Sequence, residues 1–126
     1  MCLCCLGFAL LLDRMIDEAQ TAFDEQLRIS RRHGDLGLVA YGLLGLAMLA
    51  SRNGDSEQAA ELHGAADAIH ETLGTRVEGF ESRMREADVA ALRATLGDAT
   101  FEAAYSAGRT RSQRGALPLK PVRAVE

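Results

Sequence analysis

The sequence contains no tryptophan, and phenylalanine and tyrosine together make up only 5% of its 126 residues. Proline occurs only twice, at Pro118 and Pro121 near the C-terminus. Strands are usually rich in aromatic and β-branched residues, whereas long stretches of alanine and leucine without proline are typical of helices. Because a chain of this length usually forms one domain, we expect a single all-α domain.

Basic residues are scarce through most of the chain. Residues 1–108 hold nine basic and seventeen acidic residues, a net charge of −8, whereas residues 109–126 hold five basic and one acidic, a net charge of +4. An acidic domain lacks the basic surface that binds nucleic acid, so we expect no direct nucleic-acid binding. We predict a helical domain over residues 1–108, followed by a disordered basic tail over residues 109–126.

Motifs of common enzymes are missing as well. A phosphate-binding loop needs closely spaced glycines followed by a lysine, and the only lysine, Lys120, lies in the predicted tail without such glycines before it. The chain also has no G-x-S-x-G, H-E-x-x-H or G-x-G-x-x-G motif. It therefore lacks the usual sequence motifs of a catalytic nucleophile, a zinc site and a dinucleotide-binding site. We therefore predict a protein without catalytic residues or a bound cofactor.

The N-terminal stretch "MCLCCLGFALLLDRM" is apolar enough to be considered as a secretory signal, a membrane-spanning helix or a site of lipid attachment. It lacks the positive start of a secretory signal, and its apolar run is shorter than the 20 or so residues that span a bilayer. Cys2, Cys4 and Cys5 lie too close together for a useful disulfide, although a lipid anchor, a metal clip and buried free thiols all stay open. We expect a cytoplasmic protein outside the membrane.

The spacing of apolar residues predicts about six helices separated by short turns. The first covers the apolar run to residue 12, the second follows Asp13 and ends before Gly34, the third spans residues 36–52, and the fourth follows Asp55 and ends before Gly74. A fifth ends at residue 96, and a short sixth begins at residue 98 and ends near Gly108. The apolar residues that define the fifth are Phe80, Met84, Ala87, Ala91 and Leu92.

These helices show a weak internal repeat. Ala19 is followed four residues later by Phe23, and Ala59, 40 residues after Ala19, is followed by His63. Small residues let paired helices approach and larger ones fill the gap to the next pair, as in helical solenoids. The spacing predicts two degenerate tetratricopeptide-like hairpins plus a C-terminal hairpin, with structural positions at Leu6, Gly7, Ala19, Phe23, Leu44, Gly45, Ala59, Leu62 and Ala66.

Two longer stretches, "GLLGLAMLASRNGDSEQAAELHGAADAIHETLG" and "ALRATLGDATFEAAYSAGR", carry a narrower similarity. Together with the first helix, they resemble the C-terminal tetratricopeptide-like region of actinobacterial transcriptional regulators of the LuxR-type and adenylate-cyclase-linked ATPase families. The resemblance covers roughly residues 3–109. It implies a non-catalytic interaction or sensor module for signal transduction, a fragment or remnant of a larger regulator, with Tyr41 in a groove lined by the first helix of each hairpin.

Two other functions fit the sequence. A stand-alone protein would self-associate if the end faces of its helical array lack polar caps. Alternatively, His63, Asp67 and His70 lie at i, i+4 and i+7 on one predicted helix face, a spacing that would present two imidazoles and a carboxylate to a metal ion or small ligand. We expect protein contact, with a larger regulator or with a second copy, to be the main function.

Overall fold

The computed structural model describes residues 3–12 and 14–114 of the chain, with side chains from residue 7 onward in these ranges. The described residues contain helices but no strand, which confirms the all-α prediction. The helices are α1 (Leu3–Leu12), α2 (Ile16–His33), α3 (Leu36–Arg52), α4 (Ser56–Leu73), α5 (Gly79–Leu96) and α6 (Asp98–Gln113).

Glycines end α2 and α4 where the sequence predicts. Gly34 has a φ of 69° and Gly74 a φ of 70°, in the left-handed region where a residue without a Cβ carries no steric penalty. Their backbone N–H groups donate to the carbonyls of Arg31 and Glu71. This arrangement satisfies helix-end carbonyls that would otherwise lack a donor, and it reverses the chain for the next helix.

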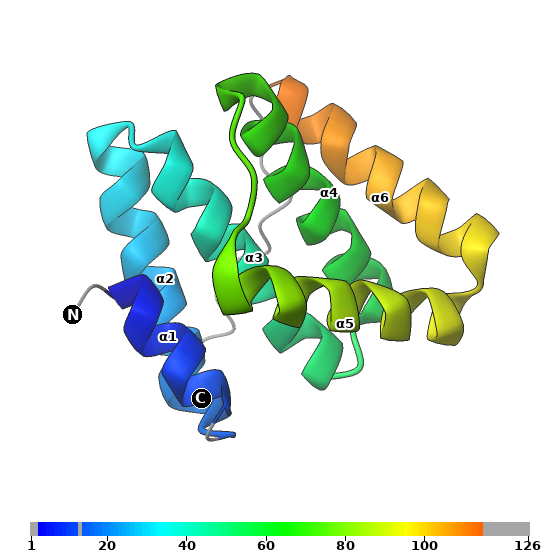
Figure 1. Cartoon of the computed structure of the whole chain (residues 1–126), viewed down its shortest axis with the longest axis horizontal. Helices are drawn as coiled ribbons and strands as arrows, with labels where there is room; N and C mark the ends of the chain where they lie inside the picture. The colour runs from blue at the N-terminus through cyan, green and yellow to red at the C-terminus, as the bar shows by residue number, and fades with distance from the viewer. Residues whose placement is uncertain (1–2, 13, 115–126) are drawn as a thin grey trace.

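Helices α1, α2 and α3 pack against one another (Figure 1), and the buried ring of Phe23 lies among them. A Cβ on Gly7 would lie 2.7 Å from this ring, and a Cβ on Gly45 would overlap it. Phe8 meets the ring edge to face, with centroids 5.0 Å apart. The two glycines therefore form the slot that holds the aromatic side chain. The surrounding buried cluster consists of Phe8, Leu11, Ala19, Phe23, Leu44, Met48 and Leu49.

Helix α4 packs chiefly against α3 on one side and α6 on the other. The C-terminal ends of α4 and α6 lie at the same end of the molecule, at the top of Figure 1. A Cβ on Gly64 would overlap the carbonyl oxygen of Tyr105, and a Cβ on Gly108 would overlap that of Glu61. The two glycines thus allow the backbones of α4 and α6 to touch.

The predicted boundary at Gly108 is wrong. Gly108 is buried inside α6, and the helix continues to Gln113. The glycine permits the close approach to α4, and the next turn adds an ion pair between Arg111 and Glu61 at 3.0 Å. Tertiary contacts therefore stabilise helix in a segment that composition alone assigns to a tail. The remainder of the predicted tail, residues 115–126, lies outside the described residues.

Helix α5 crosses the face of α3 and α4 instead of packing between neighbours (Figure 1). Of the apolar residues that define it in the sequence, only Leu92 is buried, while Ala87 and Ala91 are exposed and Phe80 is 45% exposed. The inner face instead carries charged residues beside Leu92. In Figure 1, the segment after α4 runs back along the molecule, and α5 then leads across α4 to the start of α6.

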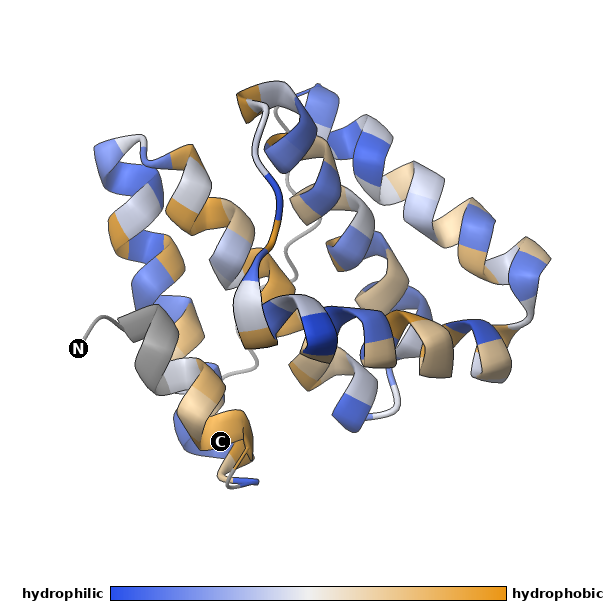
Figure 2. Ribbon diagram, in the orientation of Figure 1, coloured by the Kyte–Doolittle hydropathy of each residue, from blue (hydrophilic) through white to orange (hydrophobic). Residues whose placement is uncertain are grey.

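Apolar residues are concentrated in α1 and α3 (Figure 2). Within residues 3–12 and 14–114, none of the helices combines the length and the hydropathy needed to cross a membrane. Cys2 lies outside the described residues, as do the side chains of Cys4, Cys5 and Leu6. The hypotheses about these four residues stay untested predictions.

Candidate functional site

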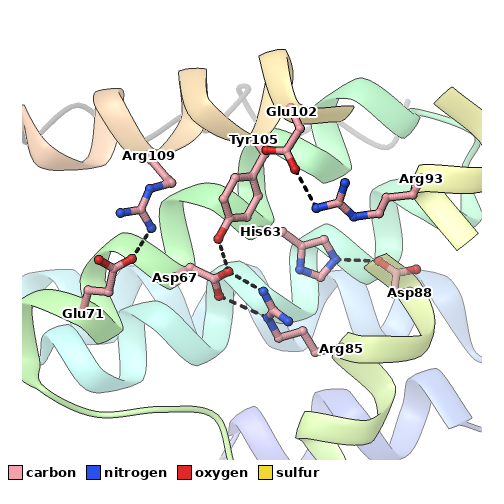
Figure 3. Close-up of polar contacts among 9 residues, drawn as sticks. All are labelled: His63, Asp67, Glu71, Arg85, Asp88, Arg93, Glu102, Tyr105 and Arg109. Carbon is pink, nitrogen blue, oxygen red and sulfur yellow. Dashed lines mark hydrogen bonds and ion pairs between the residues drawn. The ribbon is translucent and has the colours of Figure 1, made fainter. Parts of the chain in front are cut away.

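One face of α4 carries a row of polar residues that contact α5 and α6 (Figure 3). The row consists of His63, Asp67 and Glu71, at i, i+4 and i+8, which lie above one another on a helix. Each of these side chains has a partner on one of the two following helices. This row differs from the predicted one, because the contacts of His70 are with Thr75 and Tyr41 and not with α5 or α6.

His63 is the most deeply buried member of the row. Its side chain is 0% exposed, and its Nε2 lies 2.7 Å from the Oδ2 of Asp88 on α5. Because a carboxylate accepts, we assign the ring proton to Nε2. The Nδ1 of His63 has no hydrogen-bond partner among the described residues. The imidazole therefore fixes α5 to α4 through a single directional contact.

Asp67 joins all three helices. It accepts two N–H groups from Arg85 on α5 and the hydroxyl of Tyr105 on α6. Burial, and then the hydrogen bond to Asp67, raise the pKa of Tyr105 to about 12, so the phenol stays protonated and donates. Since both partners donate to one carboxylate, Asp67 is the centre of the polar contacts.

A second set of contacts lies toward the solvent. Glu71 pairs with Arg109, whose guanidinium lies 5.9 Å from the centre of the Tyr105 ring. The hydrogen bond to Glu71 raises the pKa of Arg109. Arg93 of α5 pairs with Glu102 of α6 at 2.6 Å. These exposed pairs orient α5 and α6, although exposed ion pairs add little to stability.

His70 faces α3 and the segment that leads to α5. Its Nδ1 lies 2.9 Å from the hydroxyl of Thr75, and its ring meets Tyr41 edge on, with centroids 5.5 Å apart. Burial lowers the pKa of His70 and so favours the neutral imidazole. Tyr41, the residue proposed to line a groove, packs here against His70 and the cluster around Phe23.

The predicted ligand set of His63, Asp67 and His70 does not assemble. Their partners are Asp88, Arg85 with Tyr105, and Thr75, respectively, in three separate places. Across the described ranges, no three His, Cys, Asp or Glu side chains are placed to share a metal ion. Although His63, Asp67 and His70 have the spacing i, i+4 and i+7, their side chains do not point to one common site.

A pocket of about 430 Å³ lies near the C-terminal ends of α2, α4 and α6. Its floor includes the buried side chains of Val39, Ala68 and Ile69. This volume is in the range of small-ligand sites. The residues in its wall are Arg31, Gly34, Leu36, Val39, Ala68, Ile69, Thr72, Ser112 and Gln113.

The predicted repeat positions with described side chains are all buried in the two hydrophobic clusters or against them. They are Gly7, Ala19, Phe23, Leu44, Gly45, Ala59, Leu62 and Ala66. Arg85, Asp88 and Tyr105 were not predicted as partners of α4, although their side chains make its polar contacts. A usable signal was present for two of them, because Arg85, Asp88 and Leu92 share one helix face at i, i+3 and i+7.

Comparison with models of known protein families, with curated proteins and with solved structures finds no match for this chain. The resemblance to the C-terminal region of LuxR-type regulators, and the tetratricopeptide-like arrangement, therefore stay predictions.

Proposed function

We propose that this chain is a non-catalytic docking module of a larger, signal-responsive transcriptional regulator, which acts in the cytoplasm through protein contacts. The observation that supports the proposal is the apolar outer side of α1. This helix has the sequence LCCLGFALLL, without a single charged residue, and packs against α2 and α3. A helix at the surface normally carries polar residues on the side that faces water.

The outer side of α1 continues into the following turn. Phe8 and Leu11 point into the core, whereas Ala9 is exposed, Leu12 is 58% exposed and Met15 is 41% exposed. These three exposed apolar residues lie in α1 and in the turn that follows it. We refer to Ala9, Leu12 and Met15 as the apolar edge. An apolar edge at the end of a helical array is suited to another helix, as in a chain with further repeats.

The first test measures binding to the product of the adjoining reading frame, by calorimetry, for the wild type and the double variant Leu12→Glu/Met15→Glu. We expect the double variant to lose binding because each glutamate would be desolvated at the contact. A matched control is Leu73→Glu, since Leu73 is 42% exposed at the far end of α4, and binding should survive there.

The second test separates docking from self-association. Light scattering of the wild type at low and high concentration should give a monomer. A dimer or larger species that the Leu12→Glu/Met15→Glu double variant abolishes would replace our proposal with the stand-alone oligomer. Wild-type binding that the double variant leaves unchanged would contradict docking through α1. If the adjoining reading frame encodes neither an ATPase module nor further helical repeats, the proposal that this chain belongs to a larger regulator is contradicted.

A further inference from the structure

Helix α5 is held differently from the other helices. It has 18 residues, and Leu92 alone among them is buried. Val89 and Leu96 pack on one core cluster and Met84 on the other, all partly exposed. By contrast, α3 and α4 each bury ten residues. Apolar burial is the main favourable contribution to packing, and α5 contributes fewer buried side chains to the core than α3 or α4 does.

Both ends of α5 have the geometry of hinges. Gly79 at its start has a φ of 69°, and Gly97 directly after it has a φ of 83°. Residues 75–78, which connect α4 to Gly79, have no regular secondary structure. A Cβ on Gly97 would meet no atom within 4 Å, so packing does not lock this position. Glycines at element ends can absorb large changes in backbone angles.

The contact between α5 and α4 is chemically directional. Arg85 donates to Asp67 from Nε at 3.1 Å and from a second nitrogen, and Asp88 accepts from His63 at 2.7 Å. Leu92 enters the core seven residues after Arg85. The inner face of α5 thus has the pattern Arg-x-x-Asp-x-x-x-Leu, and the face of α4 beneath it presents one acceptor and one donor.

The pair of Arg85 and Asp67 specifies the orientation of α5 more than it holds the helix in place. The side chain of Arg85 is 24% exposed and that of Asp67 is 17% exposed. Desolvation of both charges offsets much of their attraction, so the net stabilisation of α5 is modest. The same reasoning favours local opening, since segments with few buried apolar contacts open below the free energy of global unfolding.

We propose that α5 is a hinged strap over a helix-binding groove on α4, and that an amphipathic partner helix with the pattern Arg-x-x-Asp-x-x-x-Leu displaces it. His63 and Asp67 would recognise the partner's acidic and basic side chains, and the site of Leu92 would take its apolar residue. This inference names a second surface for the proposed docking function. It shares no residue with the apolar edge of α1.

The first experiment uses the unmodified chain and native-state hydrogen exchange. We expect the α5 amides to exchange through a local opening, with lower protection than the buried amides of α4 and α6. Equal protection in α5 and α4 would overturn the strap. This measurement needs no variant, so it stands even if a substitution prevents folding.

The second experiment adds a fluorescent peptide of residues 79–96 to the chain. In the host variant Arg85→Gln/Asp88→Asn, which removes both charges of the inner face of α5, we expect the peptide to bind about tenfold more tightly than to the wild type. The control peptide exchanges the two charges, Arg85→Asp with Asp88→Arg, and should not bind. Equal binding of both peptides, or binding of neither, would overturn the proposal that α4 has a groove that recognises this charge pattern.

Failure of this inference differs from failure of the proposed function. Loss of partner binding in the Leu12→Glu/Met15→Glu variant tests the edge of α1 alone, and the α5 peptide tests α4 alone. A rigid α5 with intact binding at α1 would remove the strap and leave the docking module.

Discussion

Two regions of the molecule use glycine to bring helices together, but the glycines face different obstacles. In the region of α1, α2 and α3, Gly45 faces the ring of Phe23. In the region of α4 and α6, Gly64 faces the backbone carbonyl of Tyr105. A side chain can be replaced by a smaller one, whereas a backbone can yield only if the helices separate. A second substitution at Phe23 should therefore restore stability lost by adding a side chain at Gly45. No side-chain substitution should do so for Gly64, which faces a backbone carbonyl.

The regions also differ in polarity. The cluster around Phe23 consists of apolar side chains. Across α4, α5 and α6 the apolar core is joined by the contacts of Asp67 and His63. Apolar packing tolerates changes of shape if volume is kept, whereas a buried polar group needs its partner. We therefore expect the region of α4, α5 and α6 to tolerate fewer substitutions than the region around Phe23.

The largest effect should come from Gly64→Ala. The added Cβ would overlap a backbone oxygen, so α6 must move away from α4 at a cost of about 3 kcal/mol or more in the free energy of unfolding. Urea denaturation measures this loss. Gly37→Ala is the control, because a Cβ on Gly37 has as its nearest contact Asp35 at 3.6 Å, and alanine there should stabilise α3 by about 0.5–1 kcal/mol.

The next effect tests whether the first contact can be repaired. Gly45→Ala should cost about 2 kcal/mol, because the Cβ displaces the Phe23 ring from its slot. Adding Phe23→Leu should recover part of that loss, with a coupling energy of about 1 kcal/mol in a double-mutant cycle. Tyr105→Phe should give no such recovery for Gly64→Ala. Strict additivity at Gly45 and Phe23 would refute the distinction between the two contacts.

A smaller loss is expected from Asp67→Asn. The amide keeps the shape of the side chain but leaves Arg85 with an unpaired, partly buried charge. Since both groups keep some exposure to water, we expect a loss of about 1–2 kcal/mol in the free energy of unfolding. Arg28→Gln breaks the exposed pair with Glu25, and its urea midpoint should match the wild type. Equal midpoints for Asp67→Asn and the wild type would show that the polar row is not stabilising.

The smallest effect concerns pH and His70. Because burial lowers the pKa of His70 in the folded protein, the unfolded chain binds the proton more readily. The contribution is present above the ordinary pKa of about 6.5 and is lost as the pH falls through the folded value. The wild type should lose more stability than His70→Gln between about pH 7.5 and pH 5.5. Parallel curves in thermal unfolding would contradict this assignment.

The helix ends that carry a local chemical signal could be predicted well. The third helix spans Leu36–Arg52, as predicted, and the glycines at positions 34 and 74 end α2 and α4. These ends depend on the φ of one residue and on capping within a few residues. The residues that determine a helix end are therefore within a few positions of it in the sequence.

The partners of the site could not be predicted in the same way. The row of His63 and Asp67 is visible as a helix face, but its partners on α5 and α6 come from 18 to 38 residues away. Gly108 resembles a helix stop, and only the surface of α4 shows that it is a contact. The inner face of α5 carries Arg85 and Asp88, and the spacing of apolar residues gives no information about such polar contacts.

By itself, the sequence determined the all-helical class and most helix ends, since propensity and capping act over a few neighbouring positions. The tertiary structure decided which faces meet. It placed α6 beside α4, sent α5 across them, extended α6 past Gly108 and separated His63, Asp67 and His70. The physical reason is that each of these outcomes depends on surfaces brought together by the whole fold, where one helix supplies the space or the charge that another requires.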